Sequence, residues 1–219
     1  MTKRLTMTLA ALTLLLSSTG CGDTPTGARG VYMLLDTSGT YSLELKKAQQ
    51  IISAVLTRLG PGDSFAVARI DTGSFSEKDI IARVTIDDRP SVSNRQKRVF
   101  LARIKRFVQG LKPAAYTDIT GGILQASEFL DEKGAKRKVI VIYSDLKEEL
   151  ANGYVRKNLK FKLDGYRVVA LNVTKLRTDN VDPRQYMGRL KTWQARVRDG
   201  GGDWQVINNL ENLQELLPN

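Results

Sequence analysis

Residues 36–40 have residue types and a spacing that suit a metal ion. Asp36 stands at the end of an apolar run over residues 31–35, and two hydroxyl residues, Ser38 and Thr40, follow it at alternate positions. The apolar run predicts a buried strand, so the carboxylate and both hydroxyls leave it on one turn. Hard oxygen ligands of this kind suit Mg²⁺ or Mn²⁺. The alternative is an ordinary helix N-cap, in which hydroxyl oxygens accept hydrogen bonds from free backbone N–H groups.

Two further segments place oxygen ligands at similar positions. A second apolar run, residues 139–143, is followed by Ser144 and Asp145. Thr117 comes directly before a segment with the pattern of a helix, residues 118–124. We therefore expect Thr117 and Asp145 to join the first cluster.

Together these residues resemble the metal-ion-dependent adhesion site of von Willebrand factor A (vWA) domains, over residues 29–217. That family holds one divalent cation with an Asp-x-Ser-x-Ser motif, a threonine and a later aspartate. The resemblance implies the set Asp36, Ser38, Thr40, Thr117 and Asp145. Two departures stand out: Thr40 replaces a serine but keeps its hydroxyl, and Leu146 occupies the position of a glycine.

The resemblance also implies how the site works. Ser38 and Thr40 would bind the cation directly, Thr117 directly or through water, and the two aspartates would hold metal-bound waters. A carboxylate from a partner protein would complete the coordination, so the implied function is cation-dependent protein binding without catalysis. Asp118 is expected either as a further outer-shell acceptor or as an N-cap.

Alternating strand and helix patterns predict an α/β domain with helices on both faces of its sheet. Expected strands are residues 31–36, 64–70, 80–86, 138–143, 167–173 and 204–207, and expected helices are residues 43–59, 119–131, 155–163, 184–197 and 210–217. Ser93 and Gln96 form a capping-box pattern that opens one more helix. We expect a doubly wound, mainly parallel six-stranded sheet of order 3-2-1-4-5-6. Strand 3 is antiparallel, because only residues 71–79 join it to strand 2. Ligands of such sheets bind where the strand order reverses, which is between the strands that end in Asp36 and Asp145.

The first twenty residues predict an export signal. Lys3 and Arg4 precede an apolar stretch and then small residues up to Cys21, the only cysteine of the chain. The pattern resembles a bacterial lipoprotein signal, which implies cleavage before Cys21, lipidation of its thiol and a tether over residues 21–30 ahead of a domain at 31–217. With Gly22 after the cysteine, outer-membrane delivery is the favoured destination if the source is Gram-negative. The alternative is a secreted protein with an incidental cysteine.

The charge of the chain restricts its partners. The 34 Lys and Arg against 23 Asp and Glu give a net charge of +11, which becomes +9 when Lys3 and Arg4 leave with the signal. Basic residues concentrate at 95–98, 103–106, 136–138 and 156–162. In an exported lipoprotein this excess favours anionic lipid headgroups or an acidic partner. Nucleic acid is not expected, because aromatic residues are only 7% and are not interleaved with the basic ones.

Two other functions compete with cation-dependent binding. A haloacid-dehalogenase-like phosphatase would use Asp36 as its nucleophile, although Ser38 replaces the aspartate that serves as general acid in that family. The other is a lipoprotein scaffold that binds through its basic face and has a vestigial metal site. The absence of histidine excludes a Ser-His-Asp triad and any histidine-bound zinc.

Overall fold

The computed structural model describes residues 27–39, 41, 44–71, 73–156 and 159–217. In chain order its strands and helices are β1 (Arg29–Asp36), α1 (Leu45–Arg58), β2 (Ser64–Ile70), β3 (Ile80–Thr85), α2 (Pro90–Gln109), α3 (Ile119–Glu132), β4 (Arg137–Tyr143), β5 (Tyr166–Leu171), α4 (Pro183–Asp199) and β6 (Asp203–Ile207). Three 3₁₀ helices accompany them: η2 (Glu77–Asp79) and η3 (Arg177–Asn180) lie in connections, and η4 (Leu210–Leu216) follows β6. Within these residues, no helix combines the length and apolar character needed to cross a membrane.

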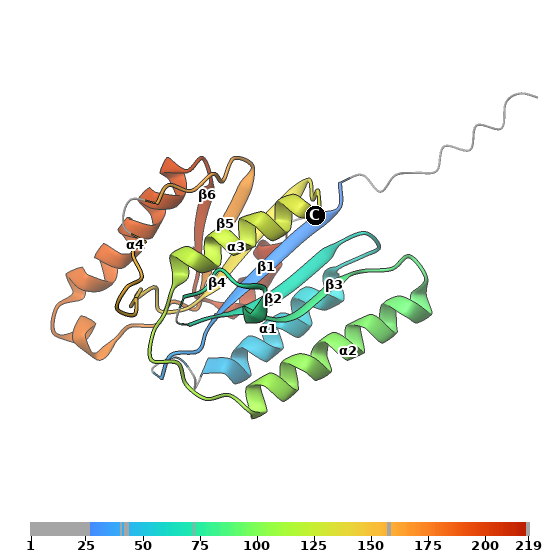
Figure 1. The fold of residues 1–219 in the computed structure, drawn as a ribbon, viewed down its shortest axis with the longest axis horizontal. Coiled ribbons are helices and arrows are strands. Elements are labelled where there is room, and N and C mark those ends of the chain that lie inside the picture. Colours follow the sequence, from blue (N-terminus) through green and yellow to red (C-terminus); the bar gives the residue numbers. More distant parts are fainter. Residues whose placement is uncertain (1–26, 40, 42–43, 72, 157–158, 218–219) are drawn as a thin grey trace, which may run out of the picture.

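The six strands form one sheet in the order β3-β2-β1-β4-β5-β6, with helices on both faces (Figure 1). Every pair is parallel except β2 and β3, which are antiparallel. This confirms the predicted fold class, strand order and antiparallel strand. The order reverses between β1 and β4, so the crevice expected for a ligand lies beyond the carboxyl ends of these two strands.

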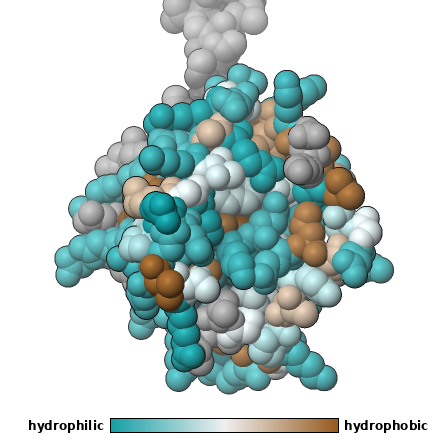
Figure 2. Space-filling view, turned by 90° about the vertical axis from the view of Figure 1, so that its left-hand side faces the viewer, coloured by the Kyte–Doolittle hydropathy of each residue, from teal (hydrophilic) through white to brown (hydrophobic). Residues whose placement is uncertain are grey.

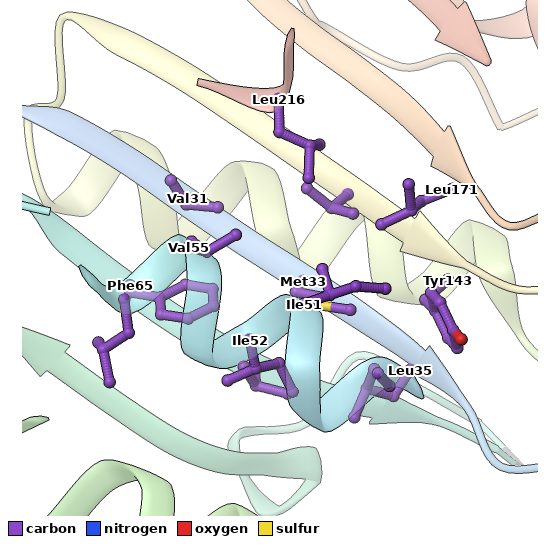
Figure 3. Packing of buried hydrophobic residues seen from close by; sticks show 14 of the residues in the cluster. Val31, Met33, Leu35, Ile51, Ile52, Val55, Phe65, Tyr143, Leu171 and Leu216 are labelled. Carbon is purple, nitrogen blue, oxygen red and sulfur yellow. The ribbon is translucent and has the colours of Figure 1, made fainter. Parts of the chain in front are cut away.

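The central strand β1 is covered on both faces, as parallel sheets require. Alternate side chains enter different cores: Val31, Met33 and Leu35 face one cluster, while Tyr32 and Leu34 face the other. Figure 3 shows the first cluster, in which α1 packs Ile51, Ile52 and Val55 against β1. Since all of these side chains are nearly or fully buried, the two cores hold the end of β1 in a defined place.

Three local predictions were wrong. Helix α2 begins at Pro90, three residues before the proposed capping box. Gln96 instead accepts from the backbone N–H of Asp87 (3.0 Å) and donates to the carbonyl of Thr85 (3.0 Å), so it ties α2 to the end of β3 and to the loop that follows this strand. The last predicted helix is the 3₁₀ helix η4.

The described part of the predicted helix at 155–163 is not helical. Arg156 reaches Asp118 (2.9 Å), whereas Phe161 is buried and the backbone N–H of Leu163 donates to the carbonyl of Gly200 (2.6 Å). Contacts to different parts of the domain therefore override the weak helical propensity of this segment.

Candidate metal centre

The pairing of β1 with β4 brings the two predicted strand ends together. Leu35 pairs with Tyr143, so the next residues, Asp36 and Ser144, leave the sheet side by side. The Ser144 hydroxyl donates to Asp36 Oδ2 at 2.6 Å, and the backbone N–H of Ser38 donates to Asp36 Oδ1 at 2.9 Å. The Asp36 carboxylate is thereby oriented by one group from each strand end.

Thr117 reaches the same carboxylate from the segment before α3. Its hydroxyl lies 3.5 Å from Asp36 Oδ1, which is at the outer limit of a hydrogen bond. Two backbone hydrogen bonds of 2.8 and 2.9 Å join Thr117 to Glu149 in the segment after β4. On the other side, the backbone N–H of Ala114 donates to the carbonyl of Thr37 at 2.8 Å. The threonine is therefore held between the two segments that carry the aspartates.

Asp145 lies in the turn after β4 and is 3% exposed. Its Oδ1 accepts from the backbone N–H of Lys147 at 2.8 Å, and its carbonyl accepts from Arg189 Nε at 3.1 Å. The turn continues through Leu146, at the position of the family's glycine, with a positive φ of 65°. That left-handed conformation costs a leucine about 1 kcal/mol or more. Burial of the side chain in the second cluster, which also contains Tyr32 and Leu34, and a 3.0 Å hydrogen bond from Trp193 Nε1 to the Leu146 carbonyl offset this cost.

The charge environment separates these two aspartates from the other buried ones. Among the described residues, six aspartates are buried, and four of them form ion pairs with arginines: Asp63, Asp79, Asp118 and Asp179. In the same part of the chain, Asp36 and Asp145 form hydrogen bonds but no ion pair. Buried carboxylates are costly without a compensating positive charge, so this pair fits a divalent cation.

Burial without an ion-pair partner also shifts the pKa values of Asp36 and Asp145. Burial raises the pKa of the Asp36 carboxyl above its ordinary value, and the hydrogen bonds from Ser144 and Ser38 only partly oppose this. Burial likewise raises the pKa of Asp145 to about 6, and the negative charge of Asp36 adds to the effect. The backbone hydrogen bond from Lys147 and the positive charges of Arg189 and Lys147 only partly oppose this rise. The two carboxylates are therefore close enough to repel each other.

Asp118, the possible outer-shell residue, has two other partners. It caps α3 by accepting from the backbone N–H of Gly121 at 2.8 Å, and it pairs with Arg156 at 2.9 Å. Arg156 also donates to the carbonyl of Ser74 at 3.1 Å, which links the loop after β2 to this site. A role for Asp118 around a metal stays a prediction.

The structure thus brings together four of the five predicted ligands: Asp36, Ser38, Thr117 and Asp145. Thr40 and Cys21 lie outside the described residues. Sequence reasoning missed the role of Ser144, which is fully buried and orients Asp36. The equivalent positions of the two residues could have revealed this role. Ser144 follows the apolar run of β4 just as Asp36 follows that of β1, so parallel pairing of the two strands places them side by side.

Comparisons with solved structures find similar folds at low sequence identity. The pilus adhesin SpaC from Lactobacillus rhamnosus GG, in an open conformation, is 10% identical over 86% of this chain and 29% of its own, with a TM-score of 0.52. Manganese-loaded TRAP from Plasmodium vivax is 15% identical over 88% and 73%, with a TM-score of 0.49. A von Willebrand factor type A protein from Catenulispora acidiphila is 15% identical over 86% and 40%, with a TM-score of 0.47. Neither a family model nor a curated protein matches the sequence.

The fold is of the vWA type. It has the predicted strand order and antiparallel edge strand, and the described residues form four α-helices where six helices were predicted. At these identities the likeness concerns the fold alone.

Proposed function

We propose that this protein is a membrane-anchored vWA-type domain that binds a protein partner through a divalent cation. The observation that carries the proposal is the pair of buried aspartates, Asp36 and Asp145, whose carboxylates form no ion pair, whereas every other buried aspartate in the described chain pairs with an arginine. Mg²⁺ or Mn²⁺ would supply the compensating charge and an open coordination position for a partner's carboxylate.

The chemistry of the surrounding groups supports a hard cation. Ser38 and Thr117 offer neutral hydroxyl oxygens, as does Thr40 by sequence. The chain has no histidine to offer a nitrogen ligand, and its one cysteine is Cys21. With the hydroxyls as direct ligands and the two carboxylates holding metal-bound waters, the cation would keep an open position for an acidic residue of the partner. Ser144 would keep Asp36 in a fixed orientation in both the free and the bound state.

The orientation of the sheet suits a tethered protein. The described chain enters β1 at Arg29, and the proposed site lies at the other end of this strand, about 25 Å away. An anchor at Cys21 would hold the amino end of the sheet near the membrane, so the site would point toward a partner in the periplasm or outside the cell.

The surface around the site supports an interface with a protein. Several large apolar side chains are exposed in connections at the carboxyl ends of the strands: Phe75, Tyr116, Tyr154, Val155 and Val181. Figure 2 looks onto the side toward which β1 runs in Figure 1, and there hydrophobic areas alternate with hydrophilic ones. A mixed surface of this kind is typical of interfaces that form and separate.

Capture of partners from the native cell envelope tests the function. Wild-type protein should retain a partner in Mg²⁺ and release it in chelator, whereas Asp36→Asn and Asp145→Asn should retain none under either condition. Asp203→Asn, an exposed aspartate at the start of β6, is the matched control and should behave as wild type.

Two results would contradict this function. Capture that is indifferent to chelator and to both site substitutions, but is lost in high salt, would support binding through the basic face. Hydrolysis of a phosphate ester that disappears in Asp36→Asn would support the phosphatase.

The anchor has a separate test. Cells that make the wild-type protein should incorporate labelled palmitate into it, and Cys21→Ala should abolish the label, because the chain has no other cysteine thiol. The Asp203→Asn variant should keep the label. Equal labelling of wild type and Cys21→Ala would refute the lipoprotein prediction.

A further inference from the structure

A groove runs between the edge strand β3 and helix α2, and none of the proposed metal ligands lines it. It consists of two adjoining cavities of about 560 and 270 Å³, and Arg103 lines both. Because β3 and α2 run in opposite directions along the chain, the smaller cavity lies between the end of β3 and the start of α2. The larger one lies between the start of β3 and the end of α2.

The groove is strongly basic. Six positively charged side chains line it and no acidic residue does: Arg69, Arg83, Arg95, Arg103, Arg106 and Lys112. Arg69 pairs with Asp71 and Asp79, and Arg83 pairs with Glu77. The other four side chains are exposed and form no ion pair among the described residues. Four cations without an ion-pair partner along one groove make this surface positive.

Apolar side chains stand between these cations. Ile81 and Val84 of β3 face Val99, Phe107 and Leu111 across the groove, and Val99 is 48% exposed. The strand itself is at the edge of the sheet, so one row of its backbone groups lies outside the ladder with β2. The groove therefore combines charge, apolar contacts and an open strand edge along a straight path.

We propose that this groove binds an extended acidic segment of a partner protein, with glutamate or aspartate side chains alternating with apolar ones. A strand laid beside β3 presents alternate side chains in opposite directions, which matches the mixture of cations and apolar groups in the walls. A lipid bilayer would bind cations that protrude from a flat surface. The cations of this groove line a concave path instead, which favours a peptide segment over a bilayer. The proposal does not depend on the metal centre.

Fluorescence anisotropy of a labelled peptide tests this surface. A peptide of about nine residues that alternates glutamate with valine would span the length of α2. The wild-type protein should bind it with an affinity that falls as salt rises and that does not change with chelator or with Asp36→Asn. The double variant Arg103→Glu with Arg106→Glu should weaken binding by about tenfold or more.

The matched control lies on the same helix. Arg98→Glu with Lys105→Glu makes the same change in net charge at two exposed residues that do not line the groove. This variant should bind within about threefold of wild type. Equal losses in the two double variants would overturn the proposal, because net charge alone would then explain binding. Tight binding of phosphatidylglycerol vesicles without binding of the peptide would overturn it in favour of a lipid surface.

Discussion

Addition of Mg²⁺ or Mn²⁺ is expected to stabilise the wild-type protein by about 2.7 kcal/mol when the free cation is at one hundred times its Kd. A cation at the proposed site would bind the folded state alone, because only folding brings the end of β1, the Thr117 segment and the turn after β4 together. Chemical denaturation in each cation and in chelator measures this gain. Neither Asp36→Asn nor Asp145→Asn should show it.

In chelator, where no cation is bound, Asp145→Asn should stabilise the folded protein relative to wild type. The folded state raises the pKa of Asp145 to about 6 from an ordinary value of 3.8. Between these two values the folded state binds more protons than the unfolded state, so stability falls as the pH rises through this window. Well above pH 6 the carboxyl of Asp145 is ionised in the folded state, and the folded protein bears the full free-energy cost of burying this charge. Removal of this charge by Asp145→Asn should therefore stabilise the metal-free protein at pH 7 by about 1 to 3 kcal/mol.

The choice of asparagine keeps the local hydrogen bonds. An amide oxygen can still accept from the backbone N–H of Lys147 at residue 145, and from that of Ser38 at residue 36. Asp203→Asn should gain as much from the cation as wild type does. A cation effect of equal size in wild type and in both site variants would show that these aspartates do not form the metal centre.

Replacement of Gly121 by alanine is expected to destabilise the protein by about 3 kcal/mol. Gly121 is in the first turn of α3, where an added Cβ would lie 2.1 Å from the carbonyl oxygen of Ser74 and 2.5 Å from Asp118 Oδ2. Neither atom can withdraw easily, since Arg156 holds both Ser74 and Asp118. The helix start must shift instead, and Thr117 must shift with it. Denaturation in chelator measures the loss, and cation titration should show weaker metal binding.

Gly188 provides the control for this substitution. It lies inside α4, is exposed, and has no atom within 4 Å of an added Cβ. Gly188→Ala should stabilise the protein by about 0.5 to 1 kcal/mol, because alanine has the higher helix propensity. A Gly121→Ala protein as stable as wild type would show that α3 is free to move away from the loop after β2.

The strands and most helices could be predicted because their signals are local. Strand β2 coincides with its prediction, and β1 and β4 extend theirs by one or two residues at the amino end. Helix α2 was misplaced because Pro90, at its first turn, is a stronger start signal than the Ser93 and Gln96 pattern. The helix predicted at 155–163 was wrong because Arg156 and Phe161 make long-range contacts, which the hydrophobic periodicity of the sequence does not reveal.

The sequence by itself determined which residues could meet. An aspartate after each of two buried strands, and the parallel order of those strands, are enough to place Asp36 and Asp145 at one crevice. Only the tertiary structure decided that these two carboxylates form no ion pair with any described residue, while those of Asp118 and Asp179 pair with arginines. It also decided that Ser144 orients Asp36 and that cations from β2, β3 and α2 line one groove. The physical reason is that ion pairing and burial depend on which elements pack together, whereas strand ends depend on local patterns alone.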